Sequence, residues 1–275
     1  MKIKSKIIIS FLFVLLSQNL FAQDISTDRP DRTESAETVG KNKFQIETGI
    51  EYSSIKNKNT EVVMQNGNII EGDLKVSTLT APTTLFRYGL TDKIELRLGL
   101  DFDAAFSRFG DIDSLSENSK LSLNAPQIGA KFSIFKGQKW QPDFSIITKL
   151  TLPNIGGESK QEEHVIPELV FAFGNEINST FSLGYNIGLT ADYKFNVTDL
   201  SYSASLGINL NEKTGSFVEI FGNTPDAKFK EFTNSVDGGF TYLVKSNFQV
   251  DVYGGLGLST EANDFFLGTG FGYRF

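Results

Sequence analysis

Segments in which apolar residues alternate with small or polar ones recur along the chain. In IELRLGLDFD, residues 94–103, every second residue is apolar, and Glu95, Arg97 and Asp101 lie between them. Similar runs occupy residues 44–52, 181–190, 200–210 and 265–275. These runs have the roughly 9–11 residues that a tilted strand needs to cross a bilayer, and they exceed the 5–6 residues typical of soluble sheets. The pattern predicts an all-β fold, a transmembrane antiparallel β-barrel.

The charged residues of these runs set the register of the strands. A shift of residues 94–103 by one position would turn Arg97 toward lipid, at a cost of about 2–4 kcal/mol near the membrane midplane. Less regular strands are predicted at 78–90, 121–135, 143–152, 166–174, 217–222, 235–244 and 248–257. The total is about 12 strands, an even number as in bacterial single-chain barrels.

The segments between the predicted strands alternate in length. Short connections are expected at 91–93, 136–140, 175–179, 211–215 and 245–247, and longer polar ones at 55–77, 107–120, 153–165, 193–199, 223–234 and 258–263. Short periplasmic turns and longer external loops are typical of outer-membrane barrels. We therefore expect the barrel to lie in the cell outer membrane of a Gram-negative bacterium, with membrane lipid around it.

The first 22 residues have the features of a secretory signal peptide. Three lysines precede the apolar residues 7–16, and Leu20-Phe21-Ala22 is a plausible cleavage site. The absence of cysteine rules out a lipid-anchored cysteine and any disulfide. We predict a signal peptide at residues 1–22, a polar leader at 23–42 and the barrel at 43–275.

The leader has two interpretations. It is too polar for a lipid-facing strand, since it carries Asp28, Arg29, Asp31 and Arg32. One possibility is a frayed periplasmic end, because chain termini are often poorly ordered. The other is a plug that folds into the lumen and pairs Arg29 and Arg32 with wall carboxylates such as Glu47 or Glu95.

The polar face of the strands supplies candidate residues for the lumen. Opposite charges that simply pair across the bore are one interpretation, and a charged constriction that selects solutes is the other. A barrel of about 12 strands is wider than a filled 8-strand barrel and narrower than an open porin. The lumen candidates are Glu47, Glu51, Arg87, Glu95, Arg97, Asp101, Lys131, Lys149, Glu168, Asp237 and Arg274.

Other functional classes find little support. The formal net charge of -7 argues against a nucleic-acid partner. A single histidine, His164, and no cysteine argue against a transition-metal site, and we expect no cofactor. Ser159 and His164 share one polar segment without an orienting third group, so catalysis is not expected. The glycines of GTGFG are not followed by a helix, as dinucleotide binding requires.

The last strand carries aromatic residues at alternate positions up to the final residue of the sequence. Phe271, Tyr273 and Phe275 resemble the C-terminal signal that the barrel assembly machinery reads. We expect this strand to close the barrel against residues 43–54.

Two segments resemble a known family. They are STDRPDRTESAETVGKNKFQIETGIEY, residues 26–52, and APTTLFRYGLTDKIELRLG, residues 81–99. Their Asp-Arg-Pro-Asp motif at 28–31 and the RYGLTD hairpin at 87–92 are similar to those of the meta-pathway of phenol degradation family, whose members are outer-membrane barrels described as transporters. The resemblance implies a passive channel for small solutes, hydrophobic or aromatic compounds among them. The alternatives are a structural or surface-binding barrel without transport and, third, a barrel enzyme acting on lipid.

Overall fold

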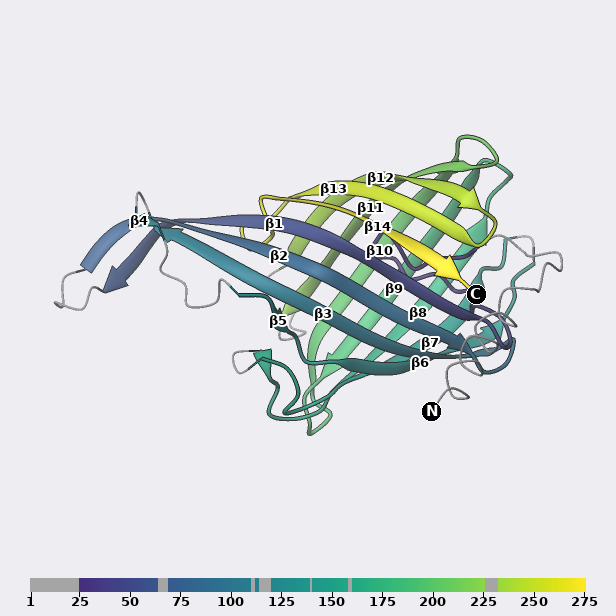
Figure 1. The fold of residues 1–275 in the computed structure, drawn as a ribbon, viewed down its shortest axis with the longest axis horizontal. Helices are drawn as coiled ribbons and strands as arrows, with labels where there is room; N and C mark the ends of the chain where they lie inside the picture. Colours follow the sequence, from purple (N-terminus) through teal and green to yellow (C-terminus); the bar gives the residue numbers. More distant parts are fainter. Residues whose placement is uncertain are drawn as a thin grey trace, which may run out of the picture.

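The computed structural model describes residues 25–63, 69–109, 112–113, 120–138, 140–157, 160–225 and 232–275. They form one 14-stranded antiparallel sheet (Figure 1). Two of the strands, β4 and β5, have only two residues each, so twelve of the described strands build the wall. Because β1 pairs with both β2 and β14, and β2 pairs with β3, the sheet closes into a barrel. The predicted fold is confirmed.

The strands have the following bounds: β1 (Phe44–Val63), β2 (Ile69–Gly89), β3 (Ile94–Phe109), β4 (Ile112–Asp113), β5 (Ser122–Leu123), β6 (Gln127–Phe135), β7 (Asp143–Thr151), β8 (Ile166–Glu176), β9 (Phe181–Ala191), β10 (Val197–Asn209), β11 (Thr214–Pro225), β12 (Thr233–Lys245), β13 (Phe248–Gly257) and β14 (Phe265–Arg274).

Burial follows the alternation of the sequence. On β3, Leu96 and Leu98 are 46% and 37% exposed, whereas Glu95 and Arg97 are 0% and 8% exposed. Ile187 on β9, Val252 on β13 and Leu267 on β14 also expose apolar side chains on the outside. Such an apolar exterior around a polar interior is the inverse of a soluble barrel, and it suits a wall surrounded by lipid.

Two predicted segments differ from the structure. Most of residues 55–77, expected to be a loop, belongs to β1 and β2. The expectation was wrong because a hairpin outside the membrane needs no apolar alternation, so its polar sequence resembled a loop. The predicted strand 121–135 is interrupted at residues 124–126, where Pro126 lacks the N–H that a ladder requires, so that only β5 and β6 remain.

The strands β1, β2 and β3 are longer than the others and extend beyond the barrel at one end (Figure 1). The extension lies on the side of the long connections, such as those between β7 and β8 and between β13 and β14. The opposite end carries the short turns at 90–93, 177–180, 210–213 and 246–247. The length difference between the two ends agrees with the prediction.

Closure of the barrel brings the two terminal strands together at the short-turn end. Gln45 pairs with Arg274 and Ile46 with Tyr273. The N–H of Phe275 donates to the carbonyl of Phe44 at 2.8 Å, and the two rings lie 5.6 Å apart. Among the described residues there is no helix of the length and apolarity that crossing a membrane requires. The predicted signal peptide lies outside the described residues.

Candidate functional site: the bore and the segment inside it

Residues 25–42, here called the N-terminal segment, lie inside the barrel. Their hydrogen bonds reach β1, β2, β3, β6, β7, β9, β11 and β13, on all sides of the wall. Both ends of the segment lie near short turns: the N–H of Ile25 donates to Ser246 O at 2.8 Å, and that of Asn42 donates to Gly89 O at 2.8 Å. The segment is thus a loop that enters the barrel and returns to the same rim.

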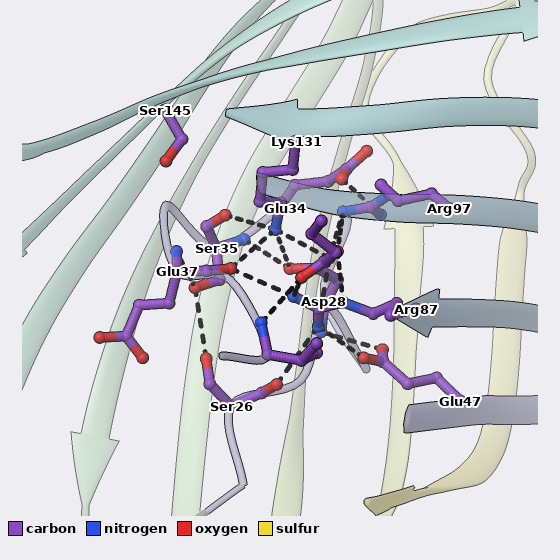
Figure 2. A network of polar contacts seen from close by, with 12 residues as sticks. Ser26, Asp28, Glu34, Ser35, Glu37, Glu47, Arg87, Arg97, Lys131 and Ser145 are labelled. Carbon is purple, nitrogen blue, oxygen red and sulfur yellow. Dashed lines mark hydrogen bonds and ion pairs between the residues drawn. The ribbon is translucent and has the colours of Figure 1, made fainter. Parts of the chain in front are cut away.

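Asp28 joins the segment to the wall of β2, β3 and β6 (Figure 2). Its carboxylate contacts Lys131 Nζ at 3.0 Å through both oxygens, Arg97 Nη1 at 2.8 Å and Arg87 Nη1 at 3.3 Å. Burial alone would raise the pKa of Asp28, but Arg87, Lys131 and Arg97 outweigh it and hold that pKa below its usual range. The carboxylate is therefore ionised inside the barrel.

Arg87 on β2 is completely buried, and its guanidinium is shared between the wall and the segment. It forms a bidentate pair with Glu95 at 2.8 and 2.9 Å and a second pair with Glu47 at 2.7 Å. It also donates to the carbonyl oxygens of Ser26 and Glu37. A buried guanidinium is tolerated only when its donors are satisfied in this way. The position of the segment is therefore fixed by backbone contacts as well as by charge.

Glu34 extends the ionic network toward β7 and β8. It lies 2.7 Å from Arg97 Nη2 and 2.7 Å from Lys149 Nζ, which also pairs with Glu168 at 3.0 Å. Burial would raise the pKa of Glu34, but Arg97 and Lys149 lower it to about 2. Asn186 on β9 holds the backbone of Glu34 through both its amide oxygen and its amide nitrogen.

The opposite wall, formed by β11 to β14 with β1, has a different character. Arg29 of the segment pairs there with Asp251 at 3.0 Å, and Arg32 pairs with Glu51 at 2.6 Å. The two arginines of the segment thus bind carboxylates, as the plug interpretation requires, but not Glu47 or Glu95. Those two carboxylates are already engaged by Arg87 of the wall.

Aromatic side chains also face the bore on this wall. Phe217, Tyr253 and Phe266 are buried and form one cluster, against which Phe221 packs. The Arg29 Cζ lies 5.8 Å from the ring centre of Tyr253, and the Arg32 Cζ lies 5.8 Å from that of Phe221 and 5.7 Å from that of Phe266. Guanidinium groups at such distances gain cation–π attraction.

Three carboxyl groups meet beside this cluster. Glu219 and Asp237 are cross-strand neighbours on β11 and β12, and both oxygens of Asp237 are buried without a hydrogen-bond donor among the described residues. Glu219 accepts hydrogen bonds from the N–H of Arg32 at 2.8 Å and from the hydroxyl of Thr33. Burial and the nearby Glu219 raise the pKa of Asp31 to about 7. Asp31 therefore loses a proton near neutral pH.

Glycines on the inner face make room for the segment. A Cβ at Gly270 would lie 2.4 Å from the Arg29 guanidinium and equally close to a backbone oxygen of β1. A Cβ at Gly184 would lie 3.0 Å from the Thr33 side chain. The small residues that alternate with apolar ones in the sequence thus permit close approach of the segment to the wall.

The structure places most predicted lumen residues on the inner face. Glu47, Arg87, Glu95, Arg97, Lys131, Lys149, Glu168, Glu51 and Asp237 are part of the contacts described above. Asp101 accepts a hydrogen bond from the N–H of Thr84 where the register of β2 and β3 shifts, and Arg274 is buried opposite Gln45. Their roles in solute selection stay predictions.

Sequence reasoning did not single out several residues of the site. They include Glu219, Tyr253 and the inward-facing Phe217, Phe221 and Phe266. Their position on the polar or glycine face of their strands was a signal, since Phe266 and Gly268 share a face that Leu267 does not. An aromatic residue on a face otherwise occupied by polar residues and glycine is unusual, and this feature of the sequence could have identified the cluster.

The remaining sequence candidates lie away from the bore. His164 is in an exposed loop, where its ring contacts that of Tyr193 at 4.1 Å and Ser159 lies outside the described residues. The described residues contain no group of three or more potential ligands arranged for a metal ion. Phe271 and Phe275 are exposed on the outer face of the closing strand, with Tyr273 between them.

Comparison of the folds places the barrel among known outer-membrane proteins. The COG4313 outer membrane channel from Pseudomonas putida F1 has a TM-score of 0.61 and 14% identity, over 91% of this chain and 100% of that one. The CymD monoaromatic hydrocarbon channel (TM-score 0.48, 9% identity, 85% and 88%) and the Pseudomonas putida toluene transporter TodX (0.46, 8%, 85% and 89%) are more distant.

Comparison of the sequence gives a more specific result. No curated protein matches the chain significantly. A family profile, however, matches residues 27–275, which include most of the N-terminal segment and the whole barrel. The chain belongs to the family described as "Putative MetA-pathway of phenol degradation".

Proposed function

We propose that the protein is an outer-membrane channel for the passive passage of small solutes, and that the N-terminal segment closes the channel at rest. The observation that carries this proposal is that the N-terminal segment fills the bore. A narrow barrel can be filled by the side chains of its own wall, but here a separate loop supplies the filling. Within the described residues, this loop continues into a wall strand only after Lys43, so it can leave without disrupting the barrel ladder.

The family and the fold support a channel, and the interior supports an aqueous path. The wall alone contributes ionised groups on both sides of the bore, which water would solvate once the segment is displaced. The aromatic cluster on β11, β13 and β14 suits hydrophobic or aromatic solutes, because it offers ring faces inside a polar lumen. We include such compounds among the solutes.

The experiment that tests this proposal is a deletion of residues 24–41, with conductance recorded in planar bilayers. The deletion is expected to raise the single-channel conductance, since it removes the loop and all its ion pairs. Heat-modifiable gel mobility serves as the control that the barrel has folded. An unchanged conductance in a folded barrel would contradict the role of the segment.

A barrel without transport is the second candidate, and the extension of β1, β2 and β3 favours it. This extension offers a surface beyond the membrane on which a partner could bind. Liposome swelling separates the two, because a surface-binding barrel gives no solute flux with or without residues 24–41. We propose no catalytic activity.

A further inference from the structure

Arg32 occupies a site that the wall has built for a cation. We propose that this site, formed by Glu51, Phe221, Tyr253 and Phe266 and here called the Arg32 site, binds small organic cations with a flat apolar face. Arg32 is then a tethered competitor that fills the site while the channel is closed. The proposal rests on the proposed channel function only for the route by which a solute arrives.

Glu51 in the site and Asp237 near it favour a ligand with a positive charge. Glu51 Oε2 lies 2.6 Å from Arg32 Nη2 and accepts a hydrogen bond from the Tyr253 hydroxyl at 2.7 Å, which fixes the carboxylate in place. Asp237, 5% exposed on β12, is a second acidic side chain in the electrostatic surroundings of Arg32. A neutral or anionic ligand would leave these carboxylates uncompensated.

The rings of the site favour a flat ligand. Phe221 and Phe266 meet edge to face at 64°, with their centres 5.9 Å apart, and the guanidinium carbon of Arg32 lies 5.8 and 5.7 Å from their ring centres. A planar cation such as an amidinium can occupy the same position, because it shares the charge and the planarity of the guanidinium. An aromatic ring attached to it gains further contact with the cluster.

The site has room beside it and is open to solvent. A cavity of about 250 Å³ adjoins Arg32 and is lined by Tyr202, Phe221, Asn186 and Glu168 among others. The Arg32 side chain is 46% exposed, whereas that of Asp28, which contacts the opposite wall, is 3% exposed. Displacing Arg32 requires the movement of one side chain with one ion pair, so a ligand can enter while the rest of the segment stays bound.

The wall of β2, β3 and β6, which carries Arg87, Arg97 and Lys131, differs from the Arg32 site in charge and in accessibility. Arg87 and Lys131 are completely buried under the segment and are engaged by Asp28, Glu47 and Glu95. An anion would have to displace Asp28 and several backbone contacts to reach them. With the segment in place, Arg87 and Lys131 are therefore inaccessible to an anion, whereas the Arg32 site is accessible to a cation.

Calorimetric titration of the purified full-length protein in detergent with benzamidinium chloride tests the proposal without requiring transport. Benzamide and benzoate, which share the ring but not the positive charge, are the matched probes. We expect Arg32→Ala to bind benzamidinium about tenfold or more tighter than the wild type, because the competing side chain is gone. Adding Glu51→Gln to that variant is expected to abolish the gain.

Lys58→Ala, which removes an exposed cation from β1 outside the bore, is the control variant. Arg32→Gln serves as a second variant should Arg32→Ala fail to give a heat-modifiable barrel. Equal affinity of wild type and both Arg32 variants, or equal binding of benzamide and benzamidinium, would overturn the proposal. Solute flux without benzamidinium binding would overturn this inference and leave the channel intact. Binding as expected without any flux would support the site and remove the channel function.

Discussion

Asp28 provides the sharpest test of how the N-terminal segment is held. We predict that Asp28→Asn loosens the segment, because the substitution keeps the size of the side chain but removes its charge. Lys131, completely buried, then retains the carbonyl oxygens of Ser35 and Glu37 as its described partners. Arg97 keeps its pair with Glu34 but loses its 2.8 Å contact with Asp28.

The magnitude follows from these contacts. Breaking a buried ion pair by removing one partner costs about 3–5 kcal/mol. Asparagine still accepts a hydrogen bond, so we take the lower end, about 3 kcal/mol. At about 1.4 kcal/mol per factor of ten, the population with a displaced segment rises about 100-fold.

Limited proteolysis measures this population directly. Trypsin can cut after Arg32 only when the segment leaves the barrel, and at low protease the cleavage rate follows the displaced fraction. We expect cleavage after Arg32 to accelerate about 100-fold in Asp28→Asn, and the conductance in planar bilayers to rise with it. Glu261→Gln, in an exposed loop, is the charge-matched control and is expected to behave as the wild type. Wild-type cleavage and conductance in a folded Asp28→Asn barrel would refute the reasoning.

Three further predictions concern pH, the lipid face and closure. Because the pKa of Asp31 is raised from its ordinary value of 3.8 to about 7 in the barrel, its contribution to seating the segment is complete below 3.8 and is lost as the pH rises to 7. Channel opening should therefore increase from about pH 4 to about pH 7 and level off above it, and Asp31→Asn should flatten this dependence. Leu98→Arg places a charge in lipid and is expected to cost about 2–4 kcal/mol in guanidinium unfolding from vesicles, whereas Leu258→Arg, in a loop, should cost nothing measurable. Deleting Phe275 removes its bond to Phe44 and is expected to lower the heat-modifiable fraction recovered in the outer membrane; full recovery would argue against a role of this residue in assembly.

The wall of the barrel was predictable from the sequence because lipid imposes a strict rule. On β3, charged residues at alternate positions admit only one register, so the amino-acid pattern by itself assigns Leu96 and Glu95 to opposite faces. The hairpin of β1 and β2 beyond the membrane obeys no such rule, and its polar residues were mistaken for a loop.

The content of the bore was less predictable. The charges of Asp28, Arg29 and Arg32 indicated that the segment needs partners, but pairing depends on distances across the barrel that no local pattern encodes. Glu95 is adjacent to Arg87 only because the short hairpin of β2 and β3 brings them together, which leaves Asp251 and Glu51 for the two arginines of the segment. The need of the segment's charged residues for ion-pair partners could therefore be predicted, but the identity of those partners could not.

The return of the N-terminal segment to the rim at which it enters determines how it resists force. A pull at Ile25 would load the contacts one after another, first the bond to Ser246, then those of Ser26 and Thr27 and then those of Asp28, rather than all at once. Peeling in this way needs far less force than lifting the whole loop in one step, although the total work is the same. The segment thus resists displacement as a unit, yet yields to traction applied at Ile25.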